Sequence, residues 1–189
     1  MAALVAVLAT GNAHKVEEIS EILGPAISLT AIDTGVVETG TTFEENALIK
    51  ARAAAAASRS LALADDSGLE VDALGGRPGT HSARWTDERD WIPRVLRAVG
   101  DAPWSERTAR FVSAAAAVWP DGREVVVRGV VEGHIAPAAR GDGGFGYDPV
   151  FVPDEGDGRT FGEMSAAEKH SLSHRGRAFR ALAPLLTNP

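Results

Sequence analysis

The stretch LVAVLATGNAHK at residues 4–15 passes from an apolar run through a turn into a helical pattern. Residues 4–9 are continuously apolar, which is typical of a short strand buried on both faces of a sheet. Asn12 can cap a helix whose apolar side chains recur at helical spacing over 13–23. The acidic residues expected outside that apolar stripe are Glu17, Glu18 and Glu21. The stretch therefore predicts a strand–turn–helix unit.

Similar patterns continue along the chain. The further strands are expected at residues 28–32, 61–64, 110–119, 124–132 and 149–152. The further helices are expected at 42–58, at 87–99 with an interruption at Pro93, and from 165 to about 186. Thr42 with Glu45 and Ser165 with Glu168 have the spacing of capping boxes. Because strand–helix alternation comes first and a hairpin around 120–122 follows, the sequence predicts an α/β fold with a mixed twisted sheet flanked by helices.

Length and composition limit the classes of protein to consider. The 189 residues, 44% of them hydrophobic, suit one domain (residues 1–189), or two lobes that share a core. No apolar run approaches the roughly 20 residues that cross a bilayer, and the apolar start has no basic stretch before it, so we expect no membrane partner and no signal peptide. Cysteine is absent, which excludes disulfides and thiolate metal sites and fits a cytoplasmic enzyme.

The charge balance argues against a general nucleic-acid binder. The formal charge is −7, whereas binding to a nucleic-acid backbone depends on broad cationic surfaces. A few cations focused in one place can still bind a small polyanion. Of the 19 Lys and Arg residues only three are lysines: Lys15, Lys50 and Lys169. A lysine ammonium is a compact charge suited to phosphate oxygens, and all three lie in segments that carry other candidate site residues.

The turn at residues 10–15 is a candidate phosphate site. A helix N-terminus presents backbone N–H groups and positive charge, and Gly11 would let a phosphate approach the backbone. Lys15 lies one helical turn further on, where its ammonium can reach the same ligand. The spacing is not that of a P-loop. An ordinary capped strand–helix turn explains this segment equally well.

The expected helix at 42–58 places two further polar residues together. Asn46 and Lys50 are four residues apart and share one helix face. A solvated helix face is the alternative explanation. Since Asn and Lys are both scarce in this chain, we favour a binding role for the pair.

The acidic sequence Asp65-Asp66-Ser67-Gly68 follows the apolar run at 61–64. Adjacent carboxylates disfavour each other's ionisation unless something binds them, and α/β sheets place ligands at the carboxyl ends of strands. Oxygen ligands of this kind suit Mg²⁺, which usually takes one or two carboxylates together with substrate phosphates and water. An acidic turn without a ligand is the alternative.

Two later segments could hold a planar base. Residues 143–149 read GGFGYDP, in which glycines flank two aromatic side chains that could stack on a base. Lys169 and the run Ser173-His174-Arg175 bring several hydrogen-bond donors close in sequence. The first segment could equally be an aromatic-anchored loop, and the histidine could be structural.

These segments, in this order, resemble the inosine triphosphate pyrophosphatase family, also called the Ham1-like non-standard purine NTP pyrophosphatases. The resemblance extends from Leu8 to about Leu182. The blocks that carry it are LATGNAHK at 8–15, TFEENALIKA at 42–51, LADDSGLEVDALGGRPGTHSARW at 63–85, GGFGYDPVF at 143–151 and EMSAAEKHSLSHRG at 163–176. Their order and spacing are highly specific.

The resemblance implies an elongated, two-lobed α/β molecule with a central cleft, usually a homodimer, that uses Mg²⁺. It makes Asp66 the catalytic proton acceptor, and Asp66 and Glu38 the metal ligands. The substrate-binding residues that it implies are Thr10, Gly11, Asn12, Ala13, His14 (through its backbone), Lys15, Asn46, Lys50, Ser67, Phe145, Gly146, Tyr147, Asp148, Lys169, His174 and Arg175.

The implied reaction is the attack of water on the α-phosphorus of ITP, dITP or XTP, which yields a nucleoside monophosphate and pyrophosphate. Two other functions stay open from the sequence. One is the same chemistry on a pyrimidine or another modified-base triphosphate, and the other is a nucleotide-binding protein that does not hydrolyse its ligand. The acidic pair Asp65-Asp66 argues against the second alternative.

Overall fold

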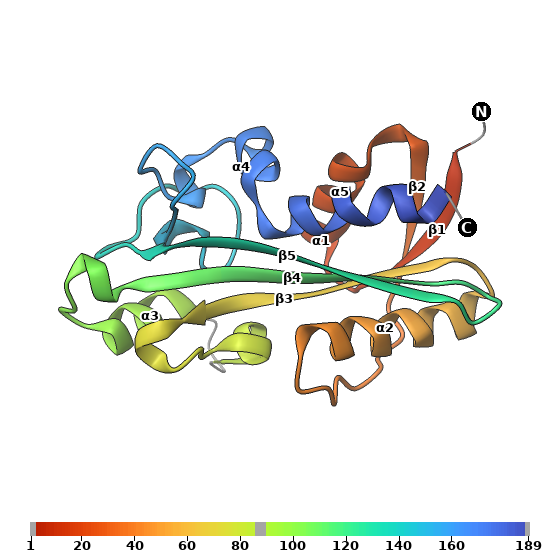
Figure 1. Cartoon of the computed structure of the whole chain (residues 1–189), viewed down its shortest axis with the longest axis horizontal. Coiled ribbons are helices and arrows are strands. Elements are labelled where there is room, and N and C mark those ends of the chain that lie inside the picture. Colours follow the sequence, from red (N-terminus) through yellow and green to blue (C-terminus); the bar gives the residue numbers. More distant parts are fainter. Residues whose placement is uncertain (1–2, 86–89, 188–189) are drawn as a thin grey trace. The chain divides into compact units, whose positions relative to one another are not determined.

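The computed structural model describes residues 3–85 and 90–187 (Figure 1). The predicted strand–turn–helix unit is confirmed as β1 (Leu4–Ala9) and α1 (Ala13–Leu23). Asn12 caps α1 as expected, since its side chain accepts the backbone N–H of His14 at 3.0 Å. Strand β2 (Ile27–Ile32) follows and runs parallel to β1 along its whole length.

The remaining strands and helices complete a mixed sheet. They are α2 (Phe43–Ser58), β3 (Ala62–Val71), α3 (Trp91–Val99), β4 (Thr108–Val118), β5 (Glu124–Ile135), β6 (Phe151–Pro153), α4 (Ala166–Leu172) and α5 (His174–Thr187). The strand order is β2-β1-β3-β4-β5-β6. Because β1 pairs parallel to both β2 and β3 whereas β5 and β6 are antiparallel, the predicted mixed α/β sheet is confirmed.

The chain divides into two compact units. Unit 1 consists of Met1–Asp66, Ser113–Gly129 and Arg175–Pro189, and unit 2 consists of Ser67–Val112 and Val130–His174. The chain passes from one unit to the other within β3, β4 and β5 and after the first residue of α5, His174. Asp66 and Ser67, neighbours in β3, therefore belong to different units.

In unit 1, helices pack on both faces of the strands. Leu8 of β1 and Leu63 of β3 are fully buried against Ile19 of α1 and Phe179 of α5. In Figure 1, α1 and α5 lie on one side of β3 and α2 lies on the other. Helix α2 turns a row of small side chains inward, and these are Ala47, Ala51, Ala54 and Ala55. Such small residues let a helix pack close to the sheet.

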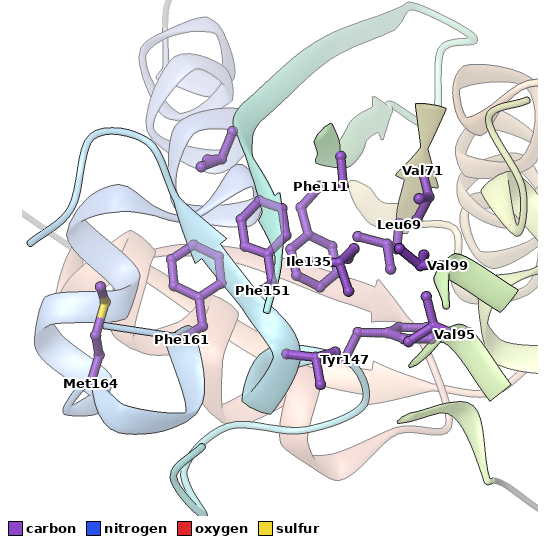
Figure 2. Packing of buried hydrophobic residues seen from close by; sticks show 13 residues of the cluster. Leu69, Val71, Val95, Val99, Phe111, Ile135, Tyr147, Phe151, Phe161 and Met164 are labelled. Carbon is purple, nitrogen blue, oxygen red and sulfur yellow. The ribbon is translucent and has the colours of Figure 1, made fainter. Parts of the chain in front are cut away.

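Aliphatic side chains together with a group of aromatic rings form the core of unit 2 (Figure 2). The ring centroids of Phe111 and Phe151 are 4.7 Å apart, and those of Phe151 and Phe161 are 5.2 Å apart. Tyr147, from the glycine-rich segment, packs into the same cluster. The cluster thereby anchors that segment to the strands of unit 2.

One predicted strand end is wrong. The run at 61–64 was expected to end before Asp65, but β3 continues through Asp65-Asp66-Ser67-Gly68 to Val71. The two carboxylates remain inside the sheet because cationic side chains reach them, as described below. A charged pair ends a strand only when nothing compensates the charge.

Smaller differences have local causes. Pro93 does not interrupt α3, since it lies in the first turn, where a helix needs no backbone N–H; residues 87–89 of the predicted helix lie outside the described residues. The long C-terminal helix is divided into α4 and α5 by Ser173, whose backbone is extended. The predicted hairpin between β4 and β5 is confirmed, and its turn has Gly122 at φ 89°. Among the described helices, none has both the length and the apolar character of a bilayer-spanning segment.

Candidate active site

Strand β3 presents two carboxylates in succession. Adjacent side chains of a strand point to opposite faces of the sheet, so Asp65 and Asp66 meet different helices. Asp65 is contacted by Lys15 of α1 and Arg175 of α5, whereas Asp66 is contacted by Asn46 and Lys50 of α2. All of these residues belong to unit 1.

Asp65 is held by two cations. The Nζ atom of Lys15 lies 3.1 Å from both carboxylate oxygens, and Nε of Arg175 lies 3.2 Å from Oδ2. Burial alone would raise the pKa of Asp65, but Lys15 and Arg175 hold that pKa far below its usual range. Asp65 is therefore a poor proton acceptor.

Arg175 also binds Glu18, which sequence reasoning placed on the outside of α1. Nη1 of Arg175 donates to Oε2 of Glu18 at 2.6 Å, and both residues are buried. The expectation that Glu18 is solvated is wrong because its partner lies on a helix at the far end of the sequence. One signal was available: Glu18 follows Lys15 by three residues and so shares its face of the helix.

Lys15 is paired with the carboxylate of Asp65 and is largely shielded from solvent. Burial lowers the pKa of Lys15, and the attraction of Asp65 opposes that effect. The described contacts of Arg175 are likewise with carboxylates of unit 1, so its guanidinium is oriented by Asp65 and Glu18.

Asp66 has a different environment on the other face. Nζ of Lys50 lies 3.2 Å from Oδ1 of Asp66 and 2.7 Å from Oε1 of Glu38. Nδ2 of Asn46 donates to the other oxygen of Asp66 at 3.2 Å. Glu38 and Asp66 thus share one ammonium group.

The two aspartates differ in proton affinity. Burial and the neighbouring charge of Glu38 raise the pKa of Asp66 despite the opposing effect of Lys50. For Lys50, burial would lower the pKa, but Asp66, Asp65 and Glu38 raise it. Since a general base works best when its pKa approaches the operating pH, Asp66 suits proton transfer better than Asp65.

The carboxylates around Lys50 fit a metal ion that arrives with its own ligands. Among the described residues there is no cluster of three His, Cys, Asp or Glu side chains that could enclose a metal. Mg²⁺ commonly binds through one or two carboxylates and completes its shell with water and substrate phosphates. Glu38 and Asp66, which already share one cation, supply such a pair.

The turn at residues 10–15 is pre-formed. Oγ1 of Thr10 accepts the backbone N–H of Asn12 at 3.1 Å, while Oδ1 of Asn12 accepts that of His14. A Cβ atom at Gly11 would lie 2.5 Å from Oδ2 of Asp33, so a side chain here would require the exposed Asp33 side chain to shift. A surface hollow of about 510 Å³ adjoins the turn and is lined by Thr10, Gly11, Asn12, Ala13, Val16, Glu17, Ala31 and Asp33.

Unit 2 brings together the predicted base-binding segment and Lys169. Oδ2 of Asp148 accepts from the backbone N–H of Phe145 at 2.7 Å and from Nζ of Lys169 at 2.8 Å. The same ammonium lies 4.9 Å from the centroid of the Phe145 ring, a distance typical of a cation–π contact. Gly144 and Gly146 have φ values of 69° and 63°, which side-chain-bearing residues rarely adopt.

The remaining predicted residues have mainly structural contacts. The hydroxyl of Tyr147 donates to the carbonyl of Ser82 at 3.0 Å, and burial raises its pKa. The ring of His174 stacks on Phe111 with centroids 4.6 Å apart and an interplanar angle of 8°. The sequence did not predict that Phe111 contacts His174, because the segment around β4 contains no motif that would single out this residue. Ser67 follows Asp66 in β3 and is half-buried.

Comparison with known proteins gives one consistent result. The family model described as the Ham1 family matches residues 6–185. The chain is 52% identical to a dITP/XTP pyrophosphatase of Symbiobacterium thermophilum, over 91% of this chain and 89% of that protein. It is 48% identical to a dITP/XTP pyrophosphatase of Rhizobium meliloti, over 94% of this chain and 93% of that protein.

Solved structures agree. The Ham1 protein of Staphylococcus aureus superposes with a TM-score of 0.82 at 37% identity, covering 96% of this chain and 97% of that one. A HAM1 protein from Coxiella burnetii gives a TM-score of 0.84 at 38% identity, covering 98% of this chain and 100% of that one.

The buried charge network predicts a large stability effect at Arg175. Arg175→Met should lower the free energy of unfolding by about 3–5 kcal/mol, because it leaves the buried carboxylates of Asp65 and Glu18 without this partner. Urea denaturation followed by circular dichroism measures the change. Arg180→Met, at an exposed position of the same helix, is the control and should change it by less than about 0.5 kcal/mol. Equal effects of the two substitutions would contradict the role given to the network.

Proposed function

The chain belongs to the Ham1 family, and from this premise we propose that it hydrolyses the non-standard purine nucleoside triphosphates ITP, dITP and XTP to the monophosphate and pyrophosphate. The observation that carries the proposal is the pair of adjacent buried aspartates in β3, each in contact with a lysine from a different helix. That arrangement supplies an acceptor for a proton and cations for a polyanion in one unit of the molecule.

Asp66 is the proposed proton acceptor. Water attacks the α-phosphorus, and the carboxylate of Asp66 takes its proton, a contribution typically worth about 10²–10⁴ in rate. The raised pKa of Asp66, caused by burial and by Glu38, supports this choice over Asp65.

The triphosphate is bound by cations and backbone donors of unit 1. Lys15 and Lys50 stabilise negative charge on the departing pyrophosphate. The turn formed by Thr10, Gly11, Asn12, Ala13 and His14 offers the N-terminus of α1, where backbone dipoles favour anions. Asp65 keeps the Lys15 ammonium in place between turnovers.

Glu38 and Asp66 would hold Mg²⁺. When bound, the ion neutralises phosphate charge as the bond to the leaving group breaks. Lys50 contacts both carboxylates, so it must share or yield its position when they bind a metal.

Unit 2 supplies the side chains for the base. Phe145 offers a face for stacking, and Lys169, which Asp148 orients, offers a donor to a purine oxygen. The further candidates here are Ser67, Gly146, Tyr147, His174 and, from unit 1, Arg175. Hypoxanthine and xanthine carry an oxygen at the six position, whereas adenine carries an amino donor there, so donors in the site satisfy the former and repel the latter.

At the level of the whole protein, we propose that residues 1–189 act as one pyrophosphatase domain whose two lobes are units 1 and 2. We further propose that it is a homodimer that works on the nucleotide pool of the cytoplasm. The names of its relatives, dITP/XTP pyrophosphatases, support the role in the nucleotide pool.

A panel of nucleotides tests the proposal. Pyrophosphate release from ITP, dITP and XTP should exceed release from ATP by a factor of roughly 10²–10⁵, and it should require Mg²⁺. The assay measures pyrophosphate from each purine and pyrimidine triphosphate, with and without the metal. Faster turnover of a pyrimidine would favour the other substrate class, and binding without release would favour a nucleotide-binding protein.

Substitution of the proton acceptor separates chemistry from binding. Asp66→Asn should reduce pyrophosphate release from ITP by about 10²-fold or more, since the amide cannot accept the proton. Binding of ITP, measured by calorimetry at saturating Mg²⁺, should change little. Asp101→Asn, at an exposed position, is the matched control and should retain full activity. Retention of activity by Asp66→Asn would remove Asp66 from the mechanism.

Lys50→Met tests the shared carboxylate pair. Without the ammonium between Glu38 and Asp66, nucleotide-free protein should bind Mn²⁺ roughly tenfold more tightly, equivalent to about 1.4 kcal/mol, while kcat for ITP falls. Titration calorimetry with Mn²⁺ measures the affinity. Arg52→Met, an exposed change on the same helix, should leave it unchanged. Unchanged or weaker Mn²⁺ binding in Lys50→Met would mean that Glu38 and Asp66 do not form the metal site.

A further inference from the structure

Asn46 lies in the first turn of α2 and is almost completely buried, with 1% of its surface exposed. Both ends of its side-chain amide are bonded within the protein. Nδ2 donates to Oδ2 of Asp66 at 3.2 Å, and Oδ1 accepts the backbone N–H of Gly40 at 2.8 Å. Because Asn46 is almost completely buried, little of this amide is accessible to a ligand.

The two bonds join segments that are separate in the chain. Asp66 is 20 residues after Asn46, in β3, while Gly40 is 6 residues before it, in the loop that carries Glu38. The side-chain amide serves both bonds because it offers a donor at one end and an acceptor at the other. An aspartate of the same shape would lose the donor and place a second anion against Asp66.

Gly40 shows how closely the loop approaches Asn46. A Cβ atom built on Gly40 would lie 2.7 Å from Oδ1 of Asn46 and 2.6 Å from Cβ of Glu45. Any side chain at this position must push the loop away from α2. Because Glu38 precedes Gly40 by only two residues, such a shift would also move the carboxylate of Glu38.

We propose that Asn46 is a positioning residue that fixes the separation between Glu38 and Asp66. This inference rests on the proposed function, in which the two carboxylates hold the metal ion. It replaces the expectation that Asn46 contacts the substrate: its amide acts through Asp66 and through the backbone of the Glu38 loop. Lys50, which contacts both carboxylates, shows that they already stand close enough to share one cation.

The test is the metal dependence of Asn46→Ala. Loss of a group that orients metal ligands typically costs about 10–100-fold in metal affinity or activity. We expect the Mg²⁺ concentration for half-maximal ITP hydrolysis to rise by that factor, with KM for ITP at saturating Mg²⁺ changed less than about threefold. Binding of Mn²⁺ to the nucleotide-free protein, measured by electron paramagnetic resonance, should weaken by a similar factor and does not depend on turnover.

Two further variants give independent evidence. Asn46→Leu keeps a branched side chain of similar size but removes both hydrogen bonds without adding charge, and it should impair metal binding at least as much as Asn46→Ala. Gly40→Ala leaves Asn46 intact but moves the loop, and it should produce the same change in metal dependence. Because both act on one contact, the double variant Gly40→Ala/Asn46→Ala should be no worse than the more impaired single variant.

Ala54→Gly is the matched control for stability. It creates a destabilised α2 at a buried position eight residues from Asn46, without touching Glu38 or Asp66. The control should lower the melting temperature and leave the metal dependence of hydrolysis unchanged. If it reproduces the Asn46→Ala phenotype, helix stability alone explains the effect and the inference fails.

The outcomes are distinguishable. A wild-type protein that releases no pyrophosphate from ITP overturns the proposed function, while Mn²⁺ binding still reports on Asn46. An active wild type whose Asn46→Ala variant keeps normal metal dependence overturns the positioning role. A raised KM for ITP with normal metal dependence would instead identify direct substrate contact and also overturn it. If Asn46→Ala does not fold, Gly40→Ala decides by the same measurements.

Discussion

The structure of unit 1 depends on two carboxylates buried side by side in one strand. An ionised carboxylate is costly to bury without a partner, and β3 contains two at successive positions. The alternation of side chains along a strand solves the problem, because it directs each carboxylate to a different face with its own cations. Helices α1 and α5 provide the cations that contact Asp65, and α2 provides the lysine that contacts Asp66. Removal of either group of partners would leave a charge in the middle of the sheet.

The same alternation separates two chemical roles. Asp65 faces two cations at hydrogen-bond distance and has a strongly lowered pKa. Asp66 faces one ammonium, which it shares with Glu38, and its pKa is raised. Two identical side chains one residue apart thus become a fixed counter-ion and a candidate base. The difference arises entirely from what each face of the sheet packs against.

The features that the sequence predicted correctly are those with local causes. The apolar run of β1, the Asn12 cap and the Thr42–Glu45 capping box each depend on residues within a few positions of one another, and all are confirmed. The errors depend on distant partners. Continuation of β3 through Asp65 requires Lys15, 50 residues away, and Arg175, 110 residues away.

The placement of Glu18 and the contacts of Asn46 illustrate the same limit within the candidate site. Glu18 is buried beside Arg175, which lies 157 residues later in the chain, and the apolar stripe of α1 gives no sign of that partner. The spacing of Asn46 and Lys50 correctly indicated that they share one face of α2. It did not indicate that the amide of Asn46 forms hydrogen bonds to Asp66 and to the backbone of Gly40. Residue type and spacing predict which side chains lie near one another. Their burial and their hydrogen-bond partners in the folded protein determine which of them remain available to a ligand.

The scarcity of lysine now has a physical explanation. Each of the three lysines forms an ion pair with a buried aspartate: Lys15 with Asp65, Lys50 with Asp66 and Lys169 with Asp148. They are therefore not surface charges that arginine could replace, since a bulky planar guanidinium differs in shape and donor geometry from an ammonium.

This pairing also bears on how a triphosphate can bind. The cluster in unit 1 sets four carboxylates, Glu18, Glu38, Asp65 and Asp66, against three cations, Lys15, Lys50 and Arg175, which leaves one negative charge. Such a cluster does not attract a free polyanion. In the proposed function, a divalent ion that accompanies the nucleotide would reverse the sign of this balance and would let the lysines turn from carboxylate to phosphate. The charge count thus supports the proposal that a metal–nucleotide complex is the species that binds.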